Sequence, residues 1–142
     1  MHHTVEIAMN VNDVMSKTVV SVEMDDRLAE VKKIFDHTQF HHLLVIENGQ
    51  LVGIISDRDL FKAISPNIGT PAASTGDEAT LNKKAHQIMS RKPVTISEDA
   101  TLEQAIALMN LRQVSCLPAI DPSNKPSGIL SWRDILKSLV PA

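Results

Sequence analysis

Two stretches of the chain carry a glycine, a serine, an arginine and an aspartate at the same spacing. They are residues 53–59 and 128–134, and both read Gly-Ile-(Ile/Leu)-Ser-x-Arg-Asp. Each lies where an apolar, strand-like run gives way to a helical pattern. The backbone amides of a helix start are expected to point outward without a partner, and the helix dipole favours an anion beside them. Together with a neighbouring arginine, such a junction is a plausible seat for a phosphate.

The aspartate of each stretch suggests a second contact. One turn into the helix, Asp59 and Asp134 would repel a phosphate, but a carboxylate accepts hydrogen bonds from two neighbouring hydroxyls, as in a ribose diol. Phosphate on the serine and arginine, ribose on the aspartate and a flat base against Val/Ile strands would together hold an adenosine nucleotide.

The same Ser-x-x-Asp spacing is also a capping box, in which the serine side chain and the acid satisfy each other's backbone amides. For a single occurrence the cap would be the better interpretation. Two occurrences in register, both retaining an arginine that capping does not require, favour a ligand. Duplicated capping is the alternative.

These stretches belong to a duplication that spans most of the chain. A step of 74 positions takes residues 14–16 onto 88–90, and a step of 75 takes 53–60 onto 128–135. One copy of roughly 60 residues would bury too small a fraction of its surface to be comfortably stable. We therefore expect the two copies to pack as a closed pair with pseudo-two-fold symmetry.

In each copy the pattern predicts the order β-α-β-β-α, which is a mixed α+β fold. The expected strands are 18–22, 42–46 and 51–55 in the first copy and 94–96, 115–120 and 127–130 in the second, with Asn48-Gly49 as a hairpin turn. Helical spacing predicts inward-facing side chains at Leu28, Val31, Ile34, Phe35, Leu60, Phe61, Ile64, Leu102, Ala105, Ile106, Leu108, Met109, Ile135, Leu136 and Leu139.

The repeat also predicts the domain organisation. The first copy spans 9–64 and the second 83–142, and a Pro-, Gly- and Ser-containing surface loop or linker joins them over 65–82. Short helices are expected to lead into the copies, at 11–15 and 81–89.

Composition narrows the class of protein. The chain has 142 residues, 43% of them hydrophobic, and a formal net charge of −3. No Lys/Arg stripe with interleaved aromatic residues is evident, so nucleic-acid binding is not expected. No apolar run approaches a membrane span and the N-terminus does not resemble a signal peptide. With a single cysteine, the sequence predicts a soluble protein of the reducing cytoplasm.

Neither catalysis nor metal binding is expected. No Ser/His/Asp set, paired general acid and base or Gly-rich phosphate loop stands out, so we expect no enzyme and no catalytic cofactor. The six histidines and Cys116 lack paired zinc-ligand spacing. Cys116 lies in an expected buried strand, where a packing role is favoured.

Taken together, the motifs resemble a tandem pair of cystathionine-β-synthase-type (CBS) domains, a Bateman module. The resemblance rests on both Gly-h-h-Ser-x-Arg-Asp stretches, on residues 14–22 and 88–96, and on 42–45 and 117–119. It implies a regulatory, non-catalytic module that binds AMP, ADP, ATP or S-adenosylmethionine between paired domains. It also implies a homodimer that acts on another protein in trans.

Carried over by position, the resemblance implies that Asp59 and Asp134 bind ribose, with Ser56 and Ser131 beside them and Arg58 and Arg133 near the phosphate. The adenine would lie against the first and second strands of each repeat, at Val20, Ser21, His42, Leu43, Leu44, Val94, Thr95, Cys116, Leu117 and Pro118. Two positions depart from the pattern. Leu44 stands where the second copy has the usual proline, Pro118, and Trp132 stands where the first copy has Asp57.

Two functions follow. The first is a sensor in which an adenine nucleotide changes the packing of the copies and a partner protein reads the change. The second is a nucleotide-free dimerisation or scaffold protein, whose Ser-x-Arg-Asp stretches serve only as helix caps.

Overall fold

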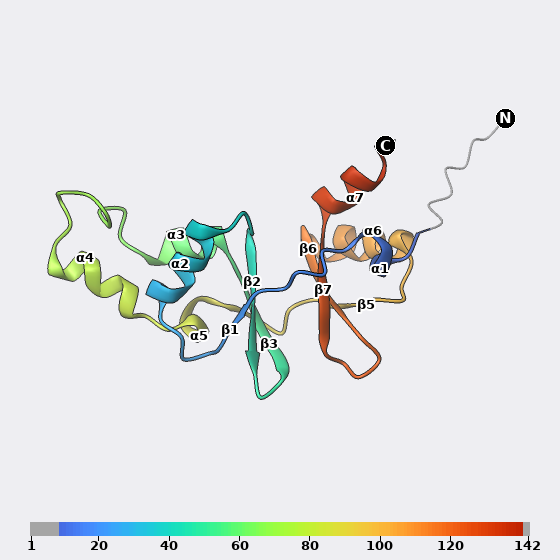
Figure 1. Ribbon diagram of the computed structural model, residues 1–142, viewed down its shortest axis with the longest axis horizontal. Coiled ribbons are helices and arrows are strands. Elements are labelled where there is room, and N and C mark those ends of the chain that lie inside the picture. The colour runs from blue at the N-terminus through green and yellow to red at the C-terminus, as the bar shows by residue number, and fades with distance from the viewer. Residues whose placement is uncertain (1–8, 141–142) are drawn as a thin grey trace. The chain divides into compact units, whose positions relative to one another are not determined.

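The computed structural model describes residues 9–140, which divide into two compact units. The first-repeat unit is formed by residues 20–93, and the second-repeat unit by 94–140 together with 9–19. Both units combine a small sheet with helices (Figure 1). The mixed α+β class predicted from the repeat is therefore confirmed. Within the described residues, no helix is long and apolar enough to cross a membrane.

The first-repeat unit has a four-stranded sheet in the order β1-β2-β3-β4. The β1–β2 pair is parallel, and the β2–β3 and β3–β4 pairs are antiparallel. Its main elements are β1 (Ser21–Val22), α2 (Leu28–His37), β2 (His42–Glu47), β3 (Gln50–Ser56), α3 (Asp57–Ala63), α5 (Ala85–Ile88) and β4 (Ser90–Arg91). The helices α2, α3 and α5 gather on one side of β2 and β3 (Figure 1). Leu28, Leu43, Ile55 and Leu60 form the centre of the core there.

The turn between β2 and β3 confirms the sequence prediction. Asn48 and Gly49 have φ values of 52° and 77°, so both adopt the left-handed conformation that a two-residue type I′ turn requires. Next to this turn Glu47 pairs with Gln50, and an irregularity between Val45 and Ile46 then shifts the register by one residue, so that His42 pairs with Ser56. The start of β2 and the end of β3 therefore lie side by side, next to the start of α3.

The second-repeat unit has a three-stranded sheet in the order β5-β6-β7. Its elements are α1 (Val11–Val14), β5 (Ile96–Ser97), α6 (Leu102–Arg112), β6 (Cys116–Ile120), β7 (Pro126–Ser131) and α7 (Trp132–Ser138). The parallel pair Ile96–Ala119 lies 74 positions after the pair Val22–Val45. The duplication in the sequence is thus a duplication of backbone register. The first strand of each repeat is shorter than predicted, with two residues in place of five and three.

The segment at the start of each repeat packs on the other repeat. Ser16, near the start of the first copy, exchanges two backbone hydrogen bonds of 2.9 Å with Ile129 of β7. The Val11 amide donates to the Ala100 carbonyl at 2.8 Å. In the same way β4, near the start of the second copy, pairs with β3. The compact units therefore divide the chain differently from the repeat boundaries at 9–64 and 83–142.

Two equivalent glycines allow these segments to approach the strands closely. A Cβ on Gly128 would lie 2.6 Å from Met15 Sδ and 2.7 Å from the Ser16 carbonyl oxygen. A Cβ on Gly53 would collide with the Met89 side chain, the counterpart of Met15. Each glycine is thus required by the segment that crosses its strand.

The segment between the repeats is folded, where the sequence predicted a loop or linker over 65–82. It contains α4 (Thr75–Ala79) and the 3₁₀ helix η1 (Thr80–Asn82). The Asp77 carboxylate accepts hydrogen bonds from the Ser74 amide at 2.9 Å, from Ser65 Oγ at 2.7 Å and from Asn67 Nδ2 at 3.3 Å. These bonds, led by the Ser74 amide, lower the pKa of Asp77 to about 2.

Four helix residues expected to face inward are exposed. Phe61 is 64% exposed, Ile106 37%, Leu136 52% and Leu139 49%. The buried partners on the last helix of each repeat are Leu60 and Ile135. Phe61 and Leu136 lie on seven-residue helices that rest on their sheets through about one row of side chains, and Leu139 is the C-cap of α7. On the eleven-residue α6 the buried residues are Leu102, Ala105 and Met109. The apolar stripe in the sequence is therefore wider than the buried face.

Candidate functional site

The two Gly-to-Asp stretches form strand-to-helix junctions of the same geometry. Ser56 ends β3 and is the N-cap of α3, and Ser131 ends β7 and is the N-cap of α7. Across the ladder Ser56 faces His42, and Ser131 faces Cys116. Each junction therefore joins the capping serine, the aspartate one turn later and the first residue of the neighbouring strand.

At both junctions the capping box is formed, as the alternative interpretation predicted. In the first, the Ser56 amide donates to Asp59 Oδ2 at 2.8 Å, and the Asp59 amide donates to Ser56 Oγ at 3.1 Å. In the second, the Ser131 amide and Oγ both donate to Asp134 Oδ2 at 3.0 Å, and the Asp134 amide donates to Ser131 Oγ at 3.2 Å.

The expectation of unpaired amides at these helix starts is wrong at most positions. The amide of the first helical residue donates to the carbonyl that precedes the neighbouring strand, at 3.0 Å from Asp57 to His41 and at 3.1 Å from Trp132 to Ser115. The capping box takes the N-cap amide and the third helical amide. Backbone groups alone therefore offer a phosphate little at these junctions, and the side chains must supply the chemistry.

The carboxylates are only half used by their caps. All the hydrogen bonds that Asp59 and Asp134 accept within residues 9–140 go to Oδ2. Both aspartates are partly exposed. A carboxylate oxygen has two lone pairs, so the Oδ1 of each acid keeps the capacity to accept two hydroxyl hydrogen bonds.

Charged and titratable side chains surround the first junction. His41 Nδ1 lies 2.9 Å from Asp57 Oδ2. Burial lowers the pKa of the half-buried His42, His41 lowers it further, and the nearby charges of Asp57 and Asp59 oppose the shift. The sequence interpretation missed the His41–Asp57 pair, although both residues lie next to elements that it placed correctly.

At the second junction a thiol and an indole replace these groups. Burial raises the pKa of the Cys116 thiol to about 12, and the charge of Asp134 adds to the effect. Trp132 is 48% exposed, and the Arg133 guanidinium carbon lies 5.9 Å from the centre of its ring. This arrangement is a cation–π contact on the surface of the unit.

The other predicted ligand residues differ in what they can offer. The Leu43 and Leu117 side chains lie in the hydrophobic cores of their units, so only their backbone is left for a ligand. Leu44 and Pro118 are also fully buried. Half-buried Val20 and Val94 pack against the cores, while Ser21 is exposed. Thr95 is half-buried, and Arg58 is exposed at the first turn of α3.

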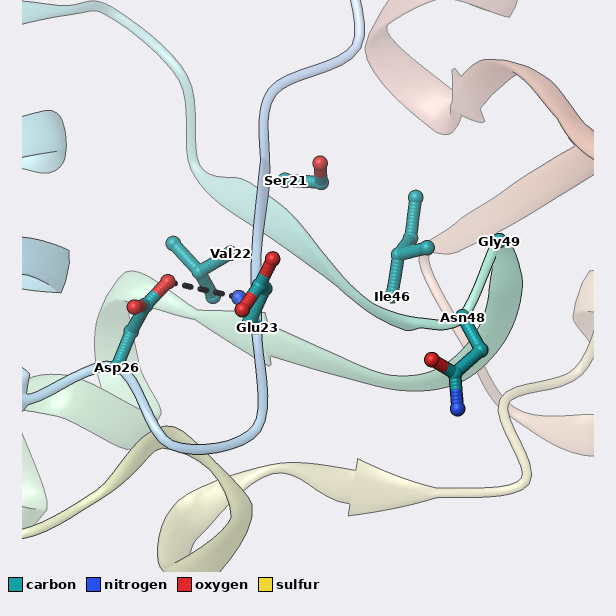
Figure 2. Close-up of a pocket in the computed structure, with 7 residues that line it drawn as sticks. All are labelled: Ser21, Val22, Glu23, Asp26, Ile46, Asn48 and Gly49. Atoms are coloured by element: carbon teal, nitrogen blue, oxygen red, sulfur yellow. Dashed lines mark hydrogen bonds between the residues drawn. The ribbon is translucent and has the colours of Figure 1, made fainter.

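A separate surface hollow lies at the opposite end of β2 from His42. Of the predicted ligand residues it includes Ser21 alone. Figure 2 shows Asp26 and Glu23 at one side of the hollow, where the Glu23 amide donates to Asp26 Oδ2 at 2.8 Å, and the β2–β3 turn at the other. It is lined by Ser21, Val22, Glu23, Asp26, Ile46, Asn48 and Gly49. Within residues 9–140 no group of three or more His, Cys, Asp or Glu side chains gathers in the way a metal site requires.

Comparison with known proteins shows to which family this architecture belongs. The family model described as CBS domain matches residues 11–66 and again 85–141. A CBS domain-containing protein of Dictyostelium discoideum is 32% identical over 135 residues, which cover 92% of this chain and 90% of that protein. Inosine-5'-monophosphate dehydrogenase of Methanocaldococcus jannaschii is 32% identical over 136 residues, covering 95% of this chain and only 24% of the enzyme.

Among solved structures, the CBS domain pair of protein MJ0100, in complex with 5'-methylthioadenosine and S-adenosyl-L-methionine, superposes with a TM-score of 0.75 at 26% identity. The match covers 93% of this chain and all of that one. Both repeats therefore match the same family. The chain belongs to the CBS-domain family and carries two CBS domains.

Proposed function

We propose that this pair of CBS domains is a regulatory module that binds an adenosine-containing ligand: AMP, ADP, ATP or S-adenosylmethionine. The similar CBS domain pair of MJ0100 is in complex with two such molecules, 5'-methylthioadenosine and S-adenosyl-L-methionine. The proposal carries this ligand class to the present chain. Which adenosine derivative binds is the finer question that the experiments below address.

The observation that carries the proposal is the half-used carboxylate at both junctions. A cap alone needs one oxygen, and Oδ2 of Asp59 and of Asp134 supplies it. Oδ1 is left to accept from the two hydroxyls of a ribose, so capping and ligand binding do not compete for the same lone pairs. The cap also fixes the carboxylate in place before the ligand arrives, which lowers the entropic cost of binding.

The proposed module performs no chemistry of its own. A thiol with a pKa of about 12, as at Cys116, is protonated at neutral pH and is a poor nucleophile. The related dehydrogenase extends far beyond the matched region, since the match covers 24% of its length. In the proposed mechanism the ligand stabilises the form of the protein that binds it, and a partner protein reads the population of that form.

Calorimetry and thermal unfolding with AMP, ADP, ATP and S-adenosylmethionine test the proposal. Saturable binding is expected, with a ligand at 100 times its Kd stabilising the protein by about 2.7 kcal/mol. Asp59→Ala and Asp134→Ala should each weaken binding at one site. The absence of both heat and thermal shift with all four ligands would refute the proposal.

A matched control separates ligand binding from capping. Ser74 and Asp77 form the same capping box at the start of α4, in the same unit as Asp59. Asp77→Ala therefore removes a capping box, together with the bonds from Ser65 and Asn67, without touching either junction. It should lower stability while leaving ligand affinity as in the wild type, whereas Asp59→Ala should lower both.

The second candidate is a nucleotide-free scaffold or dimerisation protein. The formed capping boxes favour it, because they explain Ser-x-x-Asp without any ligand. Under this function neither variant changes ligand binding. Asp59→Ala should lose on the order of 1 kcal/mol of stability, and Asp77→Ala at least as much, because it also loses the bonds from Ser65 and Asn67. The comparison of these two variants decides between the candidates.

We further propose that the module forms homodimers and acts in the cytoplasm on a separate protein. Light scattering with and without the ligand measures the mass of the assembly. A monomer at working concentrations under both conditions would contradict the homodimer.

A further inference from the structure

The junctions of the two repeats differ most at the residue that follows the capping serine, which is Asp57 in the first and Trp132 in the second. We infer that this position sets the charge of the ligand that each site accepts, an inference that rests on the proposed function. The first site then disfavours a phosphorylated adenosine and prefers an uncharged or sulfonium-bearing one. The second site accepts the phosphorylated form.

In the first repeat, Asp57 places an additional carboxylate beside the ribose-binding acid. His41 Nδ1, 2.9 Å away, contacts Asp57 Oδ2 and restricts where this carboxylate can lie. Asp57 and Asp59 are the first and third residues of α3, so a ligand held by Asp59 lies within about one helical turn of the Asp57 charge. The charged and titratable groups at this junction are His41, His42, Asp57, Asp59 and the exposed Arg58.

In the second repeat the equivalent groups carry no additional negative charge. Trp132 replaces the carboxylate, Ser115 replaces His41, and Cys116, a protonated thiol, replaces His42. Arg133 lies over the Trp132 ring, 5.9 Å from its centre, and so brings a cation to the surface that replaces Asp57. The one carboxylate position that both junctions share is that of the proposed ribose-binding acid, which is Asp59 in the first and Asp134 in the second.

The size of the effect follows from Coulomb's law. At a partly exposed site, one unit charge several ångströms from a phosphate changes its affinity by about tenfold. An uncharged ligand of the same shape feels no such change. The ratio of the two affinities therefore isolates the electrostatic contribution from any general loss of packing.

Single-site backgrounds make the ratio measurable for each junction. Asp134→Ala leaves the first site to be titrated, and Asp59→Ala leaves the second. The ligands are AMP, uncharged 5'-methylthioadenosine and S-adenosylmethionine, measured by calorimetry at pH 8, where imidazoles are ordinarily neutral. Adding Asp57→Asn to the first background should raise the ratio of AMP to 5'-methylthioadenosine affinity about tenfold, and Asp57→Glu should leave it near its starting value.

The reverse substitution provides a second and independent variant. Trp132→Asp in the second background should lower the same ratio about tenfold, and both effects should shrink between 50 mM and 500 mM salt. Thermal unfolding checks that each variant is folded. Because the two substitutions lie in different units, the inference can still be tested if one of them does not fold.

The two proposals fail in different ways. If the wild-type chain binds none of the three ligands, the proposed function fails. If it binds them but the ratios stay unchanged by Asp57→Asn and by Trp132→Asp, the proposed function stands and this inference is overturned. An equal change for charged and uncharged ligands would also overturn it, because the substitution would then act through packing.

Discussion

The two strand-to-helix junctions share one backbone and differ in chemistry. Ser56 and Ser131 both form a capping box with an aspartate three residues later. Around these similar caps, however, the first junction holds two histidines and a second acid, while the second holds a thiol and an indole. The features that the two repeats share are those the fold needs, and the features that differ surround the acid proposed to bind the ligand.

The largest expected effect is a difference in stability between alanine substitutions at the two equivalent glycines. Gly128→Ala should cost about 3 kcal/mol of unfolding free energy, because its Cβ would meet the Ser16 carbonyl oxygen as well as Met15. Gly53→Ala should cost about 1 kcal/mol, since the atoms in its way belong to the Met89 side chain, which can change rotamer. Urea denaturation measures both.

Gly76→Ala in α4 is the control for this pair, because the nearest atom to its Cβ would be Ser74 Oγ at 3.7 Å. There alanine should be neutral or stabilise by about 0.5 kcal/mol through its lower unfolded-state entropy. Equal losses at Gly53 and Gly128 would show that the crossing segments give way equally in the two units.

The second prediction sharpens what the junctions share. Ser56→Ala and Ser131→Ala should each lower stability by about 1 kcal/mol, because each leaves the partly buried amide of the aspartate without its acceptor. Chemical denaturation of the two variants measures the difference between them. A difference larger than about 1 kcal/mol would show that the caps, although alike in geometry, are not alike in energy.

The third prediction uses the residues that face the serines across the ladder. The pKa of Cys116 is raised to about 12, so its reaction with iodoacetamide at pH 8 should be at least about 100-fold slower than that of a small thiol. His42→Cys in a Cys116→Ser background places a thiol at the half-buried equivalent position and should react faster than Cys116. Similar rates at both positions would show that the two strand starts are equally shielded.

The smallest expected effect is a pH dependence confined to the first repeat. Burial lowers the pKa of His42 in the folded state, so the unfolded chain binds more protons as the pH falls through about 6.5. Stability should therefore decrease from pH 7 towards pH 5, and His42→Gln should make that decrease shallower. Unfolding of both proteins in urea at several pH values measures the slope. A steeper slope in the variant would contradict the direction of the shift.

The sequence predicted the parts of the fold that local chemistry determines. The register of the repeat, the Asn48-Gly49 turn and the helix starts at Ser56 and Ser131 all follow from residue types at short spacing, and the structure confirms them. The packing of α1 and Ser16 on the second repeat, and of β4 on the first, could not be predicted. A sequence repeat does not reveal which copy the helix at its start packs on. The exposure of Phe61 and Leu136 was missed for a related reason, since periodicity does not reveal how much of a helix its sheet covers.

At the candidate site, spacing led to both interpretations of Ser-x-x-Asp but could not choose between them. That choice depends on whether the cap occupies one or both oxygens of the carboxylate, which residue spacing does not reveal. The compact segment around Asp77 was missed as well. Its order depends on side-chain hydrogen bonds from Ser65 and Asn67, which polar composition alone does not distinguish from a solvated loop.

The packing of each repeat's first segment on the other repeat also determines what cleavage of the chain would do. A fragment cut at residue 64 would keep α1 but lose β4, the strand that completes its own sheet, and it would leave β7 without the Ser16 pairing. Neither of the two fragments therefore contains every strand and segment that its own sheet needs. A protease cut anywhere between the copies would leave two pieces that still need each other, which ties the integrity of either candidate ligand site to the whole chain.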